Sequence, residues 1–181
     1  MNSRTYVTAD LHLGHKLIST TRGFNSLEEH DDRVLDNLNR IVSPKDTLWI
    51  LGDLLFQPGT KLPLLKRIPG NVKVVLGNHD ALRPDVYAGL GFRVYGAAYG
   101  KRGILLTHIP VHEGQKNRFS LNVHGHLHDK VLPDPWYFNV CLEQNNLEPF
   151  NIEEIYEKIP LLTEPTPADL LHGYGASLGE C

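Results

Sequence analysis

Three short runs of β-forming residues, each ending in a polar turn, constrain the fold of this chain most strongly. The runs are RTYVTA (Arg4–Ala9), DTLWILGD (Asp46–Asp53) and NVKVVLGNHD (Asn71–Asp80). Apolar runs of this length, bounded by turn residues, are typical of buried strands. A helix is predicted between the first two runs, and a short helix, Thr60–Arg67, before the third. This alternation of strands and helices predicts an α/β domain.

The first predicted helix has the clearest pattern in the sequence. It covers SLEEHDDRVLDNLNRIV (Ser26–Val42), where apolar residues recur at helical spacing. Ser26 and Glu29 form a capping-box pattern at its start, and a Ser-Pro pair follows its end. His30 of this helix and His172 near the C-terminus are expected at the surface.

The sequence changes character after Asp80. Four β-forming runs, FRVYGAAY, GILLTH, SLNVHGH and WYFNVCL, follow one another with Gly, Pro and polar residues between them. We predict that they form a more antiparallel second sheet, packed face to face with the first. The segment NIEEIYEKI (Asn151–Ile159) predicts a final helix. We expect a single domain over residues 1–159, and a loosely ordered Pro- and Gly-rich tail over 160–181.

Composition excludes several classes of protein. The 181 residues are 41% hydrophobic and 22% charged, which is ordinary for a globular domain and excludes disordered, fibrous and membrane classes. The N-terminus lacks the apolar core of a secretory signal. Cys141 and Cys181 build no disulfide framework and are expected to be free thiols. We therefore predict a cytoplasmic location.

Charge and hydropathy limit the partners of the chain. The formal net charge is −3, with no block of Lys or Arg, which argues against duplex DNA as a partner. No apolar run is long enough to span a bilayer, so no membrane partner is expected. A homodimer stays open, because no pattern locates an interface.

Polar side chains that can ligate metal follow the predicted strands. They are Asp10, His12, Asp53, Asn78, His79, His108, His126 and His128. Each residue taken alone is better explained as a turn or cap residue. Strand ends of a layered α/β fold meet at one edge, however, so these side chains can converge. Nitrogen and oxygen ligands without thiolate suit manganese, iron, zinc, nickel or cobalt.

The order of these residues resembles a known family. The series D-x-H, G-D, G-N-H-D, H and G-H-x-H spans Asp10 to His128 and closely resembles the calcineurin-like metallophosphoesterase superfamily. The resemblance implies a two-layer β-sandwich flanked by helices, with two divalent metal ions at one edge. The small size and the turn sequences GDLLFQ and LGNHD resemble the short phosphoesterases of bacteria and bacteriophages, rather than protein serine/threonine phosphatases.

The resemblance also implies a role for each position. The implied ligands of one ion are Asp10, His12 and His128. Those of the other ion are Asn78, His108 and His126. Asp53 would bridge the two ions, and His79 would be an unligated general acid whose ring Asp80 orients. The three alternating histidines of VHGHLH would then serve two ions rather than one, with His124 outside both.

Other residues beside these motifs are candidates for substrate contact. His15 and Arg22 follow the first motif, and His112 follows His108 closely. We expect these side chains to meet the substrate phosphate or line the rim of the site. An ordinary exposed loop residue is the alternative for each.

The resemblance implies a metal-dependent phosphodiesterase, and the chemistry of the ligand set suits such an enzyme. Two divalent ions about 3.5–4 Å apart bind phosphoryl oxygens and share a hydroxide that attacks phosphorus. We expect manganese as the metal and small nucleotides, including 2′,3′-cyclic nucleotides, as substrates. The alternatives are a phosphomonoesterase, a nuclease acting on RNA or single-stranded DNA, and a non-catalytic protein-binding scaffold.

Overall fold

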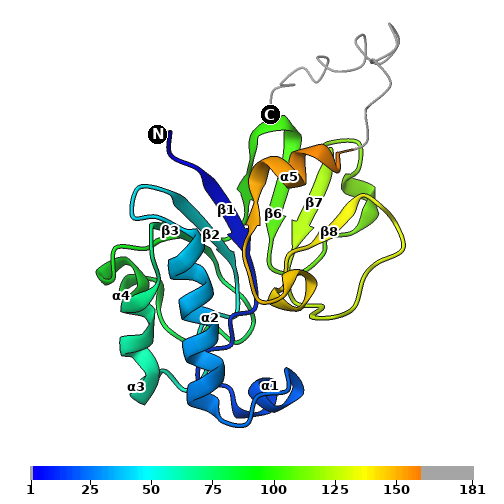
Figure 1. Cartoon of the computed structure of the whole chain (residues 1–181). Coiled ribbons are helices and arrows are strands. Elements are labelled where there is room, and N and C mark those ends of the chain that lie inside the picture. The colour runs from blue at the N-terminus through cyan, green and yellow to red at the C-terminus, as the bar shows by residue number, and fades with distance from the viewer. Residues whose placement is uncertain (1, 160–181) are drawn as a thin grey trace, which may run out of the picture.

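Two β-sheets and five short to medium helices make up the fold in the computed structural model, which describes residues 2–159 (Figure 1). The first sheet contains, in spatial order, β4 (Arg93–Tyr95), β3 (Asn71–Val75), β2 (Thr47–Leu51), β1 (Thr5–Thr8) and β9 (Phe150–Asn151). The second contains β5 (Ala98–Tyr99), β6 (Ile104–Thr107), β7 (Leu121–His124) and β8 (Tyr137–Asn139). The predicted α/β sandwich with flanking helices is confirmed. The predicted tail, 160–181, lies outside the described residues.

The helices occupy the connections between strands. They are α1 (Lys16–Thr21), α2 (Leu27–Ile41), α3 (Pro58–Lys61), α4 (Pro84–Gly89) and α5 (Ile152–Glu157). Four 3₁₀ turns, Leu62–Arg67, Lys101–Gly103, Glu113–Gln115 and Leu142–Asn145, complete the secondary structure. Within the described residues, no helix is long and apolar enough to cross a membrane.

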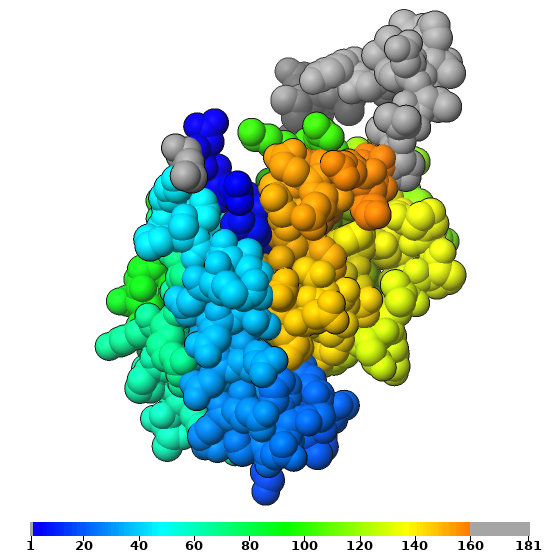
Figure 2. Space-filling view, viewed as in Figure 1, coloured from blue at the N-terminus to red at the C-terminus, as the bar shows by residue number. Residues whose placement is uncertain are grey.

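The first sheet packs against other elements on both faces. Alternate residues of each strand face opposite sides of the sheet, so its strands contribute to two apolar clusters. On one face Leu48, Ile50 and Val74 join Val34 and Leu38 of α2 in one apolar cluster. The opposite face joins the inner face of the second sheet, through buried residues that include Val7, Leu51, Val75, Leu106 and Val123. Figure 1 shows α2, α3 and α4 on the outer side of the first sheet, and Figure 2 shows both halves of the chain in close contact.

The predicted helix over Ser26–Val42 is confirmed as α2. Ser26 is its N-cap, and the Ser26 hydroxyl accepts a hydrogen bond from the Glu29 amide at 3.0 Å. The Glu29 side chain reaches back to the Asn25 amide at 3.3 Å, one residue before the position a capping box requires. The helix therefore begins where local capping chemistry predicts.

The second sheet differs from its prediction. Only β5 pairs with β6 in the antiparallel direction, whereas β6–β7 and β7–β8 are parallel pairs. Parallel neighbours need long connections, and residues 108–120 and 125–136 provide them. These connections carry His108, His126 and His128, so the parallel direction delivers all three side chains to the same edge as those of the first sheet.

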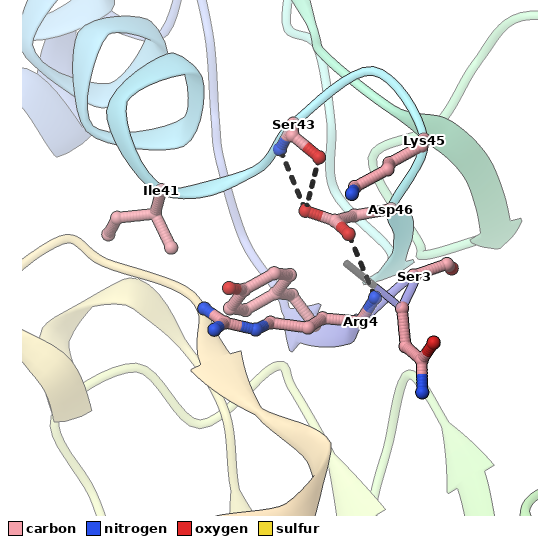
Figure 3. A pocket seen from close by; sticks show the side chains of 8 residues that line it. Ser3, Arg4, Ile41, Ser43, Lys45 and Asp46 are labelled. Atoms are coloured by element: carbon pink, nitrogen blue, oxygen red, sulfur yellow. Dashed lines mark hydrogen bonds between the residues drawn. The ribbon is translucent and has the colours of Figure 1, made fainter.

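Asp46 joins chain segments at the other end of the strands of the first sheet, where β1 and β2 begin. Its carboxylate accepts hydrogen bonds from the Arg4 amide at 2.8 Å, and from the Ser43 amide at 2.9 Å and hydroxyl at 2.7 Å (Figure 3). These donors, led by the Arg4 amide, lower the pKa of Asp46 to about 2. The charged carboxylate thus aligns the start of β1 with the start of β2.

Asp46→Asn should therefore destabilise the protein in a pH-dependent manner. The folded-state pKa of Asp46 lies below its unfolded value, so the stabilisation is complete above about pH 5 and is lost as the pH falls through about 2. Urea unfolding of the metal-free protein should show a difference between wild type and Asp46→Asn that shrinks below about pH 4. A difference that stays constant from pH 6 to pH 2.5 would contradict this role.

Candidate metal centre

Two groups of side chains meet at the edge where β1, β2, β6 and β7 end. The Asp10 group comprises Asp10, His12 and His128, and the Asp53 group comprises Asp53, His108 and His126. Within each group one ligand atom from each residue lies within 4.8 Å of the others. Asn78 joins the second group, since its Oδ1 lies 2.8 Å from His108 Nε2. The structure thus assembles all seven predicted ligands in two neighbouring clusters.

Asp53 lies between the two groups. Its Oδ2 is 3.6 Å from His12 Nε2 and 3.6 Å from His108 Nε2. Its other oxygen, Oδ1, accepts a hydrogen bond from the His79 amide at 2.9 Å. One carboxylate oxygen therefore faces both groups while the other is fixed by the backbone, which is the arrangement a bridging ligand needs.

Unpaired buried atoms test whether this site fits metal ions. Asp10 Oδ1 and His12 Nε2 are buried and have no hydrogen-bond partner, although buried polar groups are normally paired. His108 donates its Nδ1 proton to the Leu51 carbonyl at 2.8 Å. In the singly protonated ring, His108 Nε2 is then an acceptor facing Asn78 Oδ1, another acceptor. Divalent cations would satisfy all four atoms, so the residues fit two metal ions.

The Asp10 carboxylate is oriented by hydrogen bonds to its second oxygen. Asp10 Oδ2 accepts the His126 amide at 2.7 Å and the Cys141 thiol at 3.1 Å. Burial acts to raise the pKa of Asp10, but the contact with His12 and these bonds outweigh it, and the pKa is lowered. The Asp10 carboxylate is therefore charged, and its Oδ1 faces His12.

An ion pair behind the centre orients His128. His128 Nδ1 donates to Glu143 Oε1 at 2.9 Å, and this bond raises the pKa of His128. The same oxygen accepts Arg22 Nε at 2.9 Å and lies 2.8 Å from Arg22 Nη2. Carboxylates behind a histidine fix its ring and strengthen it as a ligand. The chain Arg22–Glu143–His128 was not predicted from the sequence.

The structure gives Arg22 a role different from the predicted contact with substrate. Its side chain is 3% exposed, and its remaining donors bind the carbonyls of Asp10 at 2.7 Å and Leu11 at 3.1 Å. Arg22 Nη1 also lies 3.0 Å from His30 Nε2. Because its donors are engaged within the protein, Arg22 positions the first ligand loop instead of donating to substrate.

His30 is buried, so its predicted surface position is wrong. Its side chain is 0% exposed, and its Nδ1 lies 3.0 Å from Asp31 Oδ1. Asp31 in turn accepts the Gly14 amide at 3.0 Å. His30 and Asp31 therefore link α2 to the loop that carries His12.

Asp80 connects two ligand loops. It accepts the amides of Asp53 at 2.8 Å, Leu54 at 2.9 Å and Gly77 at 2.8 Å, and the Tyr87 hydroxyl at 3.1 Å. Among the described residues, no hydrogen bond joins its carboxylate to the His79 ring, so the predicted orientation of that ring by Asp80 is not what the geometry provides. Asp80 instead holds the loop of Asp53 against the loop of Asn78.

His15 and His79 lie together on the open side of the site. The His12 ring is 5.4 Å from the His79 ring and 5.3 Å from the His15 ring, between centroids. Phe56 contacts the His15 ring at 4.1 Å, and His15 Nδ1 accepts the Ile18 amide as the N-cap of α1. His79 is exposed, so its imidazole is available to a bound molecule.

His112 and His124 take no part in either group of candidate ligands. His112 is exposed, and its Nδ1 accepts the Gly114 amide at 3.0 Å. His124 is the last residue of β7 and is buried, with its Nδ1 donating to the Gly125 carbonyl at 2.8 Å. Of the three alternating histidines, only His126 and His128 enter the two clusters, one in each.

Five candidate ligands adopt the left-handed backbone region that L-residues rarely occupy. Their φ values are 58° for Asp10, 49° for His12, 54° for Asp53, 69° for His126 and 52° for His128. Such conformations cost of order 1–3 kcal/mol each and concentrate at functional sites. Backbone hydrogen bonds between loops hold two of these residues. The Asp10 amide donates to the Gly52 carbonyl at 3.0 Å, and the His12 amide donates to the Asp53 carbonyl at 2.9 Å.

Glycines in the turns make room for the neighbouring ligands. A Cβ at Gly77 would overlap Asp53 Oδ1, and one at Gly125 would overlap Asp10 Oδ2. The Gly in G-N-H-D and the Gly in G-H-x-H are therefore required by close packing against a carboxylate. This spatial reason could not be read from the sequence, although both glycines stand in the motifs.

Gly77→Ala should weaken metal binding, because the added methyl group displaces the carboxylate of Asp53, which faces both ligand groups. We expect at least about a tenfold loss of Mn²⁺ affinity in calorimetric titration, the scale of effects from disturbed ligand support. Gly89→Ala is the matched control, since a Cβ there meets open space in α4. Unchanged affinity and stoichiometry in Gly77→Ala would contradict the packing argument.

Glu143→Gln should selectively lower the affinity of the Asp10 group for its metal ion. The variant removes the carboxylate behind His128 and leaves Arg22 without its charge partner, and about a 10–100-fold loss of affinity is expected. The Asp53 group should be little affected, so titration should resolve one normal and one weakened site. Glu148→Gln, which only breaks a surface ion pair with Arg40, should bind like wild type. Equal weakening of both sites would contradict the assignment.

The fold and the paired clusters define an α/β sandwich protein with a candidate dinuclear metal centre. Residues 3–180 match the calcineurin-like phosphoesterase family, Metallophos, and the chain belongs to this family. Its members are hydrolases that act on phosphoester bonds and use two metal ions. The predicted resemblance is thus confirmed.

The chain is also similar to individual proteins. The Gene 66 protein of Mycobacterium phage L5 is 29% identical over 166 residues, covering 72% of this chain and 80% of the relative. A protein of unknown function from Aquifex aeolicus has a similar structure, with a TM-score of 0.65 and 25% identity over 86% of this chain and 99% of that one. The Pseudomonas putida nuclease MPE, with a TM-score of 0.52, 24% identity and coverage of 69% and 62%, shares the fold.

Proposed function

We propose that this protein is a phosphodiesterase that acts on small nucleotides and uses two divalent metal ions, with manganese as the metal in use. The observation that carries this proposal is the position of Asp53 Oδ2, 3.6 Å from a histidine of each ligand group. When bound, the two ions supply positive charge that polarises the phosphoryl oxygens and activates water. Asp10, His12 and His128 would hold one ion, Asn78, His108 and His126 the other, and Asp53 would contact both.

His79 is the proposed general acid. Its amide is fixed by Asp53 Oδ1 at 2.9 Å, which keeps the residue beside the centre, whereas its side chain is exposed. Its ring lies on the open side, next to His12 and His15. An imidazole in this place can give a proton to the leaving oxygen of the ester, a contribution of about 10²–10⁴ in rate.

A hollow beside the centre supports a diester over a monoester. It has a volume of about 490 Å³, and its lining includes His126 and His128, one from each ligand group. A diester bound at the centre carries a second substituent that needs such a space, whereas a monoester does not. We propose 2′,3′-cyclic nucleotides as the first natural substrates to test.

The test is a substrate panel with the metal-depleted full chain, to which Mn²⁺ is restored. Bis-p-nitrophenyl phosphate and 2′,3′-cyclic AMP should be hydrolysed with higher kcat/KM than p-nitrophenyl phosphate. Hydrolysis of monoesters alone would favour a phosphomonoesterase, and efficient cleavage of single-stranded RNA would favour a nuclease. Absence of turnover with Mn²⁺, Fe²⁺, Zn²⁺, Ni²⁺ or Co²⁺ on every substrate would overturn the enzymatic proposal.

His79→Ala should separate proton transfer from metal binding. The variant should bind two ions like wild type but lose about 10²–10⁴ in kcat on a nucleotide diester, whose alkoxide leaving group needs a proton. The loss should be much smaller on bis-p-nitrophenyl phosphate, whose leaving phenolate is stable without one. His112→Ala, an exposed histidine outside the site, is the matched control. Equal losses on both substrates would argue against a general acid.

A further inference from the structure

The hollow beside the metal centre has the properties of a substrate subsite. Three structural segments line it: Ile18 and Thr21 of α1, the ligand loop from His126 to Lys130, and the Arg22–Glu143 pair. Because His126 and His128 belong to both the hollow and the ligand groups, a phosphate at the centre would place one of its substituents at the mouth of this hollow.

The charges around the hollow balance. Arg22 and Glu143 form an ion pair with 2.8 Å between Nη2 and Oε1, so their charges offset one another. Asp129 and Lys130 add one further charge of each sign. Such a lining gives no advantage to a second phosphate group or to an ammonium group. The occupant that it favours is therefore electrically neutral.

The remaining lining favours an aromatic group. The side chains of Ile18 and Leu127 provide apolar surface, which an aryl ring or a nucleobase would remove from water. Thr21, Asp129 and Lys130 provide hydrogen-bonding groups for the edge of a base. A volume of about 490 Å³ is within the range of ordinary ligand pockets.

The position of His79 indicates which substituent enters the hollow. His79 neighbours His12, His15 and Phe56, and none of these four residues lines the hollow. If His79 protonates the leaving oxygen, the leaving group lies on the His79 side. The hollow then faces the substituent that stays bonded to phosphorus.

We propose that this hollow binds a neutral aromatic substituent, an aryl ring or a nucleobase, on the part of the diester that is retained after hydrolysis. The inference rests on the proposed phosphodiesterase function and specifies its substrate class. It makes Ile18 and Thr21 of α1 determinants of substrate specificity.

Direct binding tests the subsite without turnover. Phenylphosphonate and methylphosphonate carry the same anionic group and cannot be hydrolysed as esters, so calorimetry on the Mn²⁺-loaded full chain can compare them. Wild type should bind phenylphosphonate at least about tenfold more tightly, since apolar burial of a ring is worth more than 1.4 kcal/mol, the equivalent of a tenfold change. Equal affinity for the two phosphonates would overturn the proposal.

A matched pair of variants places the ring in the hollow. Thr20 and Thr21 are exposed neighbours in α1, and their hydroxyls donate to the carbonyls of Lys16 at 3.1 Å and Leu17 at 3.0 Å. Only Thr21 lines the hollow. Thr21→Trp should fill it and abolish the preference for phenylphosphonate, whereas Thr20→Trp should preserve it. Ile18→Ser should reduce the preference at least threefold without adding bulk. Retention of the full preference in both Thr21→Trp and Ile18→Ser would overturn the proposal.

Kinetics identify the retained substituent. Bis-p-nitrophenyl phosphate and methyl p-nitrophenyl phosphate share a leaving group and differ only in the group that stays on phosphorus. Thr21→Trp should lower the ratio of their kcat/KM values at least tenfold, with little change for the methyl ester. Equal losses on both esters would place the leaving group in the hollow and overturn the assignment. If wild type hydrolyses neither ester, the proposed function fails, while phosphonate binding still decides whether the subsite exists.

Discussion

The candidate metal centre depends on one carboxylate, that of Asp53, which lies between two sets of imidazoles. Its Oδ2 must face His12, in the loop after β1, and His108, directly after β6, at once. The ends of strands from both sheets must therefore keep a fixed separation, and the sandwich supplies it. At the same edge, the amide of Ala9 bonds to the carbonyl of Val140 at 3.0 Å, which ties the two sheets together.

The balance of charge explains why this edge suits cations. Asp10 and Asp53 are almost fully buried, at 0% and 1% exposure, and buried carboxylates are costly unless they are paired. The nearby Arg22 is committed to Glu143 and to backbone carbonyls. Histidine rings, two backbone amides and the Cys141 thiol surround the two carboxylates. The left-handed backbone of five ligands adds to the cost. Divalent ions would offset these unfavourable terms together, so metal binding and the local fold would stabilise each other.

The sequence predicted the parts of this centre that depend on local pattern. Each ligand follows a strand that ends in a turn, and the strand ends converge because α/β topology brings them together. The direction of β6, β7 and β8 was not predictable in this way. It depends on the path that the long connections between these strands take across the sheet. The Arg22–Glu143 pair joins residues 121 positions apart, and no local pattern connects them. The burial of His30 did leave a signal, because His30, Val34 and Leu38 share one face of α2.

The dependence of His128 on Glu143 changes where the functional unit ends. The motifs finish at His128, but the carboxylate that orients this ring comes fifteen residues later, and the Cys141 thiol that fixes Asp10 lies beside it. Arg22, the partner of Glu143, also donates to the carbonyls of Asp10 and Leu11 in the first ligand loop. A fragment cut after the last motif would thus retain every candidate ligand and still lack a working geometry. The smallest portable unit of this centre is set by the residues that support the ligands.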